Sequence, residues 1–242
     1  MSNETIIRNI GLNLLKAKGF RYLRYAHCRS FLLKCSSQVR SVGVCGAGHG
    51  FAELALALEF PEIEFTLTDI VCPERPNYWV VMERSMQWGV KNIRFGVWDA
   101  LKPAPCQFDC VVNTEVLEHI KDARLAMKNM RKAARKAFYC LTPFATTEQN
   151  SDVTRRMNAY IKHGHFVCGF DEEFFRGSLG TEVQTFGAYW HELGMKLRTQ
   201  LAEMALPDVE KDFAHLVSQA EKDILESRPE PNACLAIKAM LL

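Results

Sequence analysis

Residues 40–50 read RSVGVCGAGHG, and this stretch decides the fold. Residues 39–45 are short, apolar and partly β-branched, which is typical of a buried strand. The ten residues after the stretch, FAELALALEF, carry apolar side chains at helical spacing. Between strand and helix stand three alternating glycines, Gly46, Gly48 and Gly50. Such a turn brings backbone N–H groups close to a ligand with no Cβ in the way, so we expect a ligand-binding loop here.

Strand-like and helix-like segments alternate after this loop. The strand-like runs are IEFTLTDI (63–70), IRFGVWDAL (93–101), FDCVVNTEV (108–116) and AFYCLTP (137–143). This order predicts an α/β fold, in which helices cover both faces of a mostly parallel sheet. Ligands bind at the carboxyl ends of such strands. The residues of interest at those ends are Asp69, Trp98, Asp99 and Asn113.

Two carboxylates at these ends suit a nucleoside. Asp69 lies 19 residues beyond Gly50, at the end of the next strand, where a carboxylate can accept hydrogen bonds from two ribose hydroxyls. Asp99 ends the third strand, where it can accept from an adenine amino group. Trp98 offers either a stacking face for the adenine or simple packing, and the sequence leaves both open.

The combination of GxGxG (46–50), Asp69, VWDAL (97–101) and NTEVLEHI (113–120) resembles the class I S-adenosylmethionine-dependent methyltransferases. The spacing differs from the GxGxxG of dinucleotide enzymes, and the resemblance covers about residues 38–145. It implies a Rossmann-like fold with a seven-stranded, mostly parallel sheet and an antiparallel last strand. It also implies S-adenosylmethionine as cofactor, bound by Cys45, Gly46, Gly48, Gly50, Asp69, Trp98, Asp99 and Asn113.

One position departs from this family. Its members often carry an acid two residues before the first glycine, where this chain has Val44. We therefore expect the side of the pocket that orders the methionine end of the cofactor to be built differently. The backbone of Gly46 and Asn113 remains available to the cofactor there.

A single methyltransferase domain is expected over residues 1–242. Its parts are a basic N-terminal helical segment (1–38), the cofactor-binding core (39–145), acceptor-side or lid insertions (146–232) and the last strand (233–242). Within the insertions, a helix is expected to begin near Asp171. A second helical stripe of apolar side chains begins at Phe186. The resemblance implies that the insertions and the N-terminal segment form a lid over the acceptor.

The candidate catalytic residues are Glu115, His119 and His165. A sulfonium methyl group is already activated, so the protein mainly aligns the reactants and, for a hydroxyl acceptor, takes a proton. On a helix, Glu115 and His119 would share a face, and a histidine has the pKa range of a general base near neutrality. The alternative is that Glu115 caps this helix and His119 packs against the sheet.

A metal-assisted route is a second possibility. Glu115, Glu118 and His119 resemble the magnesium-binding arrangement of ubiquinone-pathway O-methyltransferases and plant small-RNA 2′-O-methyltransferases, with His163 or His165 as a further ligand. The same motif occurs in family members that use no metal. We therefore expect no metal here and keep the metal-assisted route as the alternative.

Composition and charge limit the choice of acceptor. Hydrophobic content of 48% and charged content of 24% are typical of a globular protein. No apolar run approaches the ~20 residues of a membrane span, and we see no secretory signal. The nine cysteines include no CxxC pair and suit a reducing cytoplasm. Residues 1–40 hold eight basic side chains against one acid, which suits a phosphate, a nucleic acid, an anionic membrane surface or a solvated helical face.

These observations predict an enzyme that transfers a methyl group from S-adenosylmethionine to an oxygen or nitrogen atom of a small molecule, such as a sugar or secondary metabolite. A nucleic-acid acceptor is possible but not favoured, because the overall charge is only +2. Two alternatives stay open. One is an RNA methyltransferase assisted by a metal at Glu115, Glu118, His119 and His165. The other is a non-catalytic cofactor-binding partner subunit.

Overall fold

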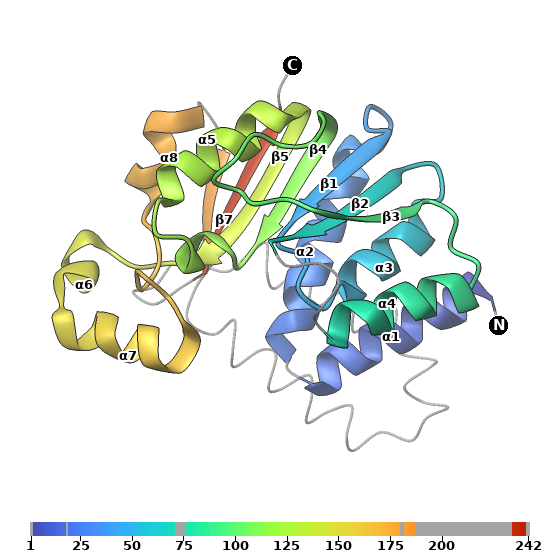
Figure 1. The fold of residues 1–242 in the computed structure, drawn as a ribbon, viewed down its shortest axis with the longest axis horizontal. Helices are drawn as coiled ribbons and strands as arrows, with labels where there is room; N and C mark the ends of the chain where they lie inside the picture. The colour runs from blue at the N-terminus through green and yellow to red at the C-terminus, as the bar shows by residue number, and fades with distance from the viewer. Residues whose placement is uncertain (1, 18, 71–75, 180–181, 187–233, 241–242) are drawn as a thin grey trace.

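The computed structural model describes residues 2–17, 19–70, 76–179, 182–186 and 234–240. Its centre is a seven-stranded sheet with the order β3-β2-β1-β4-β5-β7-β6 (Figure 1). The strands are β1 (Ser41–Cys45), β2 (Glu64–Asp69), β3 (Ile93–Val97), β4 (Phe108–Thr114), β5 (Ala134–Pro143), β6 (Glu182–Phe186) and β7 (Cys234–Met240). Neighbours pair in parallel except β7, which is antiparallel to both β5 and β6. The predicted sheet with its antiparallel last strand is confirmed.

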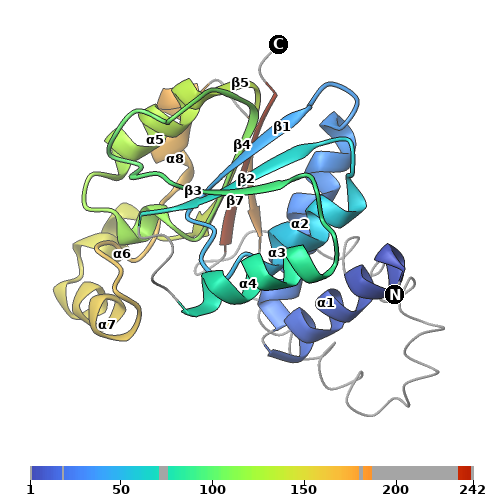
Figure 2. The same ribbon diagram turned by 45° about the vertical axis from the view of Figure 1, so that its right-hand side comes forward.

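Helices cover both faces of this sheet, as Figures 1 and 2 show. One face carries α1 (Asn3–Ala17), α2 (Gly19–Cys35), α3 (Phe51–Glu59) and α4 (Pro76–Gln87). The other carries α5 (Ala123–Ala133) and α8 (Glu172–Leu179). Two further helices, α6 (Thr147–Ser151) and α7 (Val153–His163), lie to one side and have no buried residues. No described helix combines the length and apolarity that crossing a membrane requires.

The helix boundaries follow from local chemistry. The Asp122 side chain accepts a hydrogen bond from the Leu125 backbone N–H at 3.0 Å and so caps the start of α5. Asp171 accepts from the Phe174 N–H at 2.9 Å, so α8 begins where the sequence predicts. At the other end of α7, Gly164 has a φ of 73°, the left-handed conformation that glycine adopts readily at helix ends.

Helix α2 is part of the core, although its sequence is strongly basic. Phe31 and Leu32 are buried against the sheet. The buried His27 ring makes a hydrogen bond of 2.7 Å from Nδ1 to the Tyr139 hydroxyl of β5. The next residue after Leu32, Leu33, is 48% exposed. The segment is thus an amphipathic helix with a core stripe. Its basic residues differ in exposure, since Arg24 and Arg29 are mostly buried in ion pairs with acidic residues, whereas Lys34 is exposed.

Two local predictions are wrong. Residues 115–119 do not form an α-helix, since β4 runs to Thr114 and is followed by a 3₁₀ turn, η1 (Leu117–His119). Phe186 lies in β6, whose pairing with β7 overrides the helical spacing of its side chains. The remainder of that predicted helical stripe, from residue 187, lies outside the described residues.

Candidate functional site

The glycine loop is a tight turn between β1 and α3. Gly46, Gly48 and Gly50 have φ values of 75°, 56° and 69°, a region that side-chain-bearing residues avoid. The N–H groups of Gly46 and Ala47 both donate to the Thr68 carbonyl at 2.9 Å, which ties the loop to β2. A Cβ atom at Gly46 would collide with the Val116 side chain, whereas one at Gly48 would meet nothing within 4 Å. Gly48 therefore borders open space.

Asp69 is fixed against this loop at the end of β2. Its side chain is buried, and Oδ2 accepts a hydrogen bond from the Gly48 N–H at 3.1 Å. The other oxygen, Oδ1, accepts from the Ile70 N–H at 2.7 Å. Because each carboxylate oxygen has more than one lone pair, both retain capacity for a diol. The ribose-binding role of Asp69 stays a prediction, and its position beside Gly48 suits that role.

At the end of the next strand, the two sequence candidates differ in access. Trp98 is only 3% exposed, packs near Phe108 with 6.4 Å between ring centroids, and donates from Nε1 to the Lys102 carbonyl at 3.2 Å. This geometry supports packing, and the stacking face proposed for Trp98 is not accessible. Asp99 keeps a side chain that is 26% exposed, and its Oδ1 accepts from the Leu101 N–H at 3.0 Å.

Cys45 and Asn113 offer only their backbones to a ligand, because both are buried. The Asn113 side-chain amide donates to the Cys45 carbonyl at 3.0 Å, and its Oδ1 accepts from the Cys140 thiol at 3.4 Å. These bonds link β1, β4 and β5 side by side. Burial, with the nearby Asp69 carboxylate as a smaller cause, raises the pKa of the Cys45 thiol to about 12. That thiol is therefore neutral and structural.

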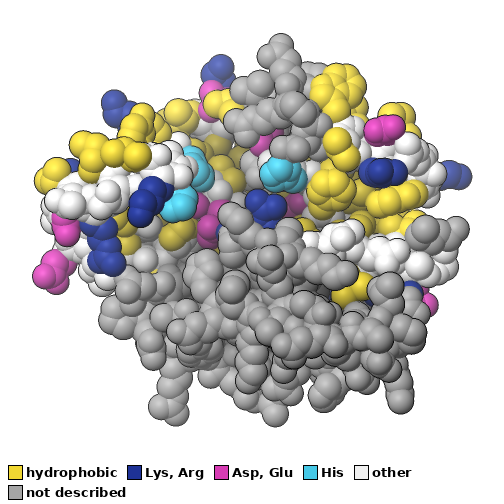
Figure 3. Space-filling model, turned by 90° about the horizontal axis from the view of Figure 1, so that it is seen from below, with side chains coloured by type: hydrophobic (Ala, Val, Ile, Leu, Met, Phe, Trp, Pro, Cys, Tyr) yellow, Lys and Arg dark blue, Asp and Glu magenta, His cyan; other side chains and the backbone are white. Residues whose placement is uncertain are grey.

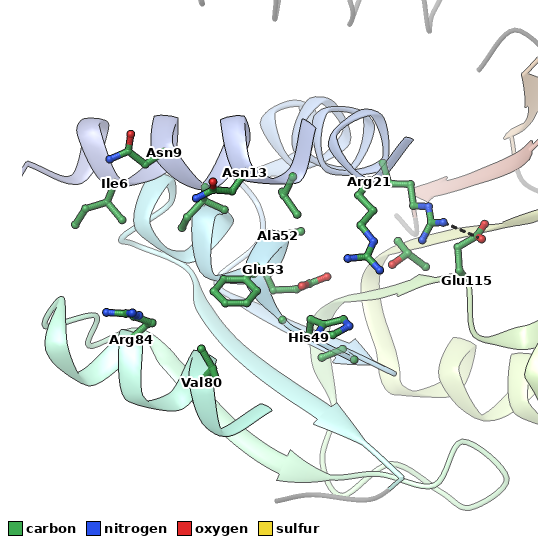
Figure 4. A pocket seen from close by; sticks show the side chains of 18 of the residues that line it. Ile6, Asn9, Asn13, Arg21, His49, Ala52, Glu53, Val80, Arg84 and Glu115 are labelled. Carbon is green, nitrogen blue, oxygen red and sulfur yellow. Dashed lines mark hydrogen bonds and ion pairs between the residues drawn. The ribbon is translucent and has the colours of Figure 1, made fainter. Parts of the chain in front are cut away.

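A cavity of about 710 Å³ opens over the glycine loop (Figure 4). Its walls come from α1, α2, the glycine loop, α3, α4 and the segment after β4. The lining residues are Ile6, Asn9, Ile10, Asn13, Leu14, Arg21, Arg24, Gly46, Ala47, Gly48, His49, Gly50, Phe51, Ala52, Glu53, Val80, Arg84, Trp88, Thr114 and Glu115. The N-terminal helices thus close the space that the glycine loop faces.

Glu115 stands where this cavity meets the end of β4. Its φ is 56°, the one positive value among the described non-glycine residues, and its N–H donates to the Leu141 carbonyl at 2.7 Å. Its carboxylate accepts from Arg24 of α2 at 3.0 Å. Burial raises the pKa of Glu115, and the Arg24 guanidinium opposes the rise. Glu115 and His119 consequently do not share a helical face, because the chain reverses at Glu115 before the 3₁₀ turn.

The other three candidate polar groups do come together. Ligand atoms of Glu118, His119 and His165 lie within 4.8 Å of one another. Glu118 is fully buried, and neither of its carboxylate oxygens has a hydrogen-bond partner among the described residues. Desolvation raises its pKa well above the ordinary value, and the nearby Glu115 adds to the rise. Figure 3, seen from the side of the strands' carboxyl ends, shows histidine side chains close to acidic ones on this face.

The imidazoles beside Glu118 are held in the neutral form. Burial lowers the pKa of His165 to about 4, with His119 and His163 as smaller causes. Burial also lowers the pKa of His119. The His119 and His165 rings meet edge to face with centroids 4.6 Å apart. His119 Nδ1 lies 3.3 Å from the Gly164 carbonyl, which can only accept, so Nδ1 carries the proton and Nε2 has a free lone pair.

The sequence did not assign several charged or titratable cavity residues to the site, among them Arg21, Arg24 and Glu53. The two arginines belong to a segment whose basic residues look alike in sequence, and nothing local distinguishes those that face the loop. Glu53 did carry a signal, since it is an acid in the first turn directly after the glycines of a chain that lacks an acid at position 44.

Comparisons with known proteins agree at the level of the fold. No protein-family model matches the chain, and neither does any curated protein sequence. Among solved structures, geranyl diphosphate methyltransferase, in complex with geranyl diphosphate (GPP) and sinefungin, is 11% identical, with a TM-score of 0.61 over 88% of this chain and 77% of that one. Magnesium protoporphyrin IX methyltransferase from Synechocystis PCC 6803, with bound S-adenosylhomocysteine, is 12% identical, with a TM-score of 0.55 over 91% and 85%.

The same fold also serves another reaction. The [4+2]-cyclase SpnF is 11% identical, with a TM-score of 0.53 over 89% of this chain and 80% of that chain. A fold match therefore does not by itself fix the chemistry, which depends on the site. The chain has the Rossmann-like fold of the class I S-adenosylmethionine-dependent methyltransferases.

Proposed function

We propose that this protein transfers a methyl group from S-adenosylmethionine to an oxygen or nitrogen atom of a small molecule, such as a sugar or secondary metabolite. The observation that carries the proposal is the cavity over the glycine loop, together with the Asp69 carboxylate, which accepts a hydrogen bond from the lining residue Gly48. Structural neighbours with bound S-adenosylhomocysteine or sinefungin support this cofactor. The cavity volume of about 710 Å³ lies in the usual range for small-molecule sites, roughly 300–1,000 Å³.

The residues of the chain would divide the work by position. Asp69 would accept hydrogen bonds from the ribose hydroxyls, and Asp99 from the adenine amino group. The backbone at Gly46 and Asn113 would border the methionine portion. Transfer is then an in-line displacement at the sulfonium methyl, for which the protein mainly supplies alignment.

Proton removal from the acceptor would fall to a histidine. Glu115 is engaged by Arg24, whereas His119 Nε2 keeps a lone pair and is neutral at pH 7. His119 is therefore the favoured base for a hydroxyl acceptor, with His165 packed beside it.

A transfer screen tests this proposal. The full chain is incubated with methyl-labelled S-adenosylmethionine and, separately, with a metabolite extract and an RNA pool. We expect label in low-molecular-weight products and only weak, salt-sensitive RNA binding, because contacts with phosphates are screened by salt. Label in RNA would contradict the small-molecule acceptor. Cofactor binding without transfer to any pool would support the non-catalytic alternative.

A metal-assisted version of the reaction is the second candidate, and a specific observation favours it. The two unpartnered oxygens of Glu118 and the neutral imidazoles of His119 and His165 form a chemically suitable ligand set. These three residues would hold a divalent ion, with Glu115 set apart by its ion pair to Arg24. A bound ion would supply Lewis-acid activation of an acceptor hydroxyl.

Metal binding and metal dependence test this second candidate separately. Titration of the chelator-treated protein with Mn²⁺ should show one site that Glu118→Gln abolishes, and transfer should be lost in EDTA and restored by Mn²⁺. Asp122→Asn, at the cap of α5, is the control for loss of an acidic side chain. Full transfer in EDTA, with no Mn²⁺ site, would exclude this route.

A further inference from the structure

S-adenosylmethionine ends in an amino acid, so its pocket needs a partner for an ammonium and one for a carboxylate. The residue two positions before the glycine loop, Val44, is apolar and only 2% exposed, and cannot serve the ammonium. The partner must therefore come from other residues that line the cavity.

Among the described residues that line the cavity, two carry a carboxylate, Glu53 and Glu115. Glu115 is already ion-paired with Arg24 at 3.0 Å. Glu53 stands in the first turn of α3, three residues after Gly50, and is only 7% exposed. The position of Glu53 in the helix does not require such burial, since an exposed acid in a first turn also interacts with the helix dipole.

Arginine side chains of α2 lie near Glu53 in the cavity. In Figure 4 the Glu53 carboxylate and the Arg21 guanidinium both point into the cavity, from α3 and α2. Burial raises the pKa of Glu53 to about 7, opposed by its own backbone N–H and by Arg24. A buried carboxylate is costly to ionise unless an opposite charge pairs with it. A cationic ligand would therefore stabilise the ionised form of Glu53.

Resting on the proposed function, we propose that Glu53 binds the ammonium of the cofactor's methionyl end, and that Arg21 lies opposite its carboxylate. Glu53 thereby takes the place of the acid that the chain lacks at Val44. The other charged groups that line the cavity are Arg24 of α2, Arg84 of α4, His49 of the glycine loop and Glu115 after β4, whereas α1 contributes only apolar and amide side chains.

Two ligands separate this subsite from the rest of the pocket. S-adenosylhomocysteine carries the amino acid, and 5′-deoxy-5′-methylthioadenosine lacks it. Glu53→Gln should weaken S-adenosylhomocysteine binding about 10- to 100-fold, the range expected for losing a charge-assisted hydrogen bond. The affinity of Glu53→Gln for methylthioadenosine should differ from that of the wild type by less than about twofold, because the substitution leaves the adenosine contacts unchanged. Glu59→Gln, on the same helix but away from the cavity, should leave both affinities unchanged.

The pH dependence gives an independent readout. Wild-type affinity for S-adenosylhomocysteine should fall as pH drops below about 7, because protonated Glu53 no longer attracts an ammonium. Glu53→Gln should remove that dependence, which separates Glu53 from His49. If the variant does not fold, the wild type can be titrated with a deaminated S-adenosylhomocysteine, which should bind at least about tenfold more weakly and without this pH dependence.

Three results would overturn the proposal. One is a folded Glu53→Gln variant with unchanged affinity for S-adenosylhomocysteine. The second is an equal loss for both ligands, which would indicate a general structural role. The third is a wild type that binds neither ligand, which would remove the proposed function together with the subsite; in the first two cases the proposed function would stand.

Discussion

Arg24 in α2 and Glu115 after β4 are 91 residues apart in the sequence and form an ion pair with 3.0 Å between Nη2 and Oε2. Both side chains are largely buried, with 22% and 18% of their surface exposed. Both also line the cavity over the glycine loop. The pair therefore joins the N-terminal helices to the strand end at which the candidate catalytic residues stand.

Removing Arg24 should cost stability, because it leaves the Glu115 carboxylate buried without its cation. We expect Arg24→Gln to lower the free energy of unfolding by about 1.5–3 kcal/mol, as for loss of a hydrogen bond to a charged group. Urea unfolding measures this. The control is Arg94→Gln, which breaks an exposed pair with Glu64 and should cost no more than about 1 kcal/mol. Equal costs for the two variants would contradict the structural role of the Arg24 pair.

Glu118 should make the stability of the metal-free protein depend on pH. Its folded-state pKa lies above the unfolded value of about 4.3. At pH values between these two pKa values, the folded state therefore binds more protons than the unfolded state. Stability should therefore fall as pH rises above about 4.3. Glu118→Gln should flatten the decline. The measurement is the urea midpoint at pH 5 and pH 8 in EDTA, and the same slope in both proteins would refute the assignment.

The glycine loop offers a matched pair of substitutions. Gly46→Ala should destabilise the fold by about 2–4 kcal/mol, from positive φ and collision with Val116. Gly48→Ala should cost only about 1–2 kcal/mol, because its Cβ meets open space. We expect the cofactor to contact the backbone of the glycine loop in that space. The Gly48→Ala variant should therefore fold but bind S-adenosylhomocysteine poorly. Unimpaired binding would place the cofactor elsewhere.

Asp69→Ala should weaken S-adenosylhomocysteine binding by about 1.5–3 kcal/mol, from lost hydrogen bonds to a charged acceptor. Isothermal titration calorimetry measures the affinity. Asp122→Ala removes a carboxylate that caps α5 away from the cavity and should leave binding unchanged. Wild-type affinity in a folded Asp69→Ala protein would remove Asp69 from the site.

Much of the fold was predictable because its signals are local. The apolar run before Gly46 and the helical spacing after Gly50 appear as β1 and α3. The turn at residues 115–119 was not predictable, because its shape depends on the bond from the Glu115 N–H to Leu141, a residue 26 positions away. The position of Phe186 in a strand was not predictable for the same reason, since the pairing of β6 with β7 is a long-range interaction.

The candidate site shows the same division. Asp69 could be placed beside the glycine loop from strand order alone. The burial of Trp98 could not be predicted, because it depends on tertiary packing in a cluster that includes Phe108 and residues of α5. The role of the N-terminal segment as a lid over the acceptor stays a prediction. The structure adds that α2 buries Phe31 and that the His27 ring is hydrogen-bonded to the Tyr139 hydroxyl. Deletion of the segment would remove part of the core, so point variants such as Arg24→Gln are the cleaner test.

The most direct test of the account is a crystal structure of the full chain with S-adenosylhomocysteine. We expect the ribose hydroxyls within hydrogen-bond distance of the Asp69 carboxylate, and the amino-acid end directed toward Glu53 and Arg21. The thioether sulfur should lie on the side of the cavity nearer Glu115. A ligand bound away from the glycine loop, or a ribose out of reach of Asp69, would contradict the central claim.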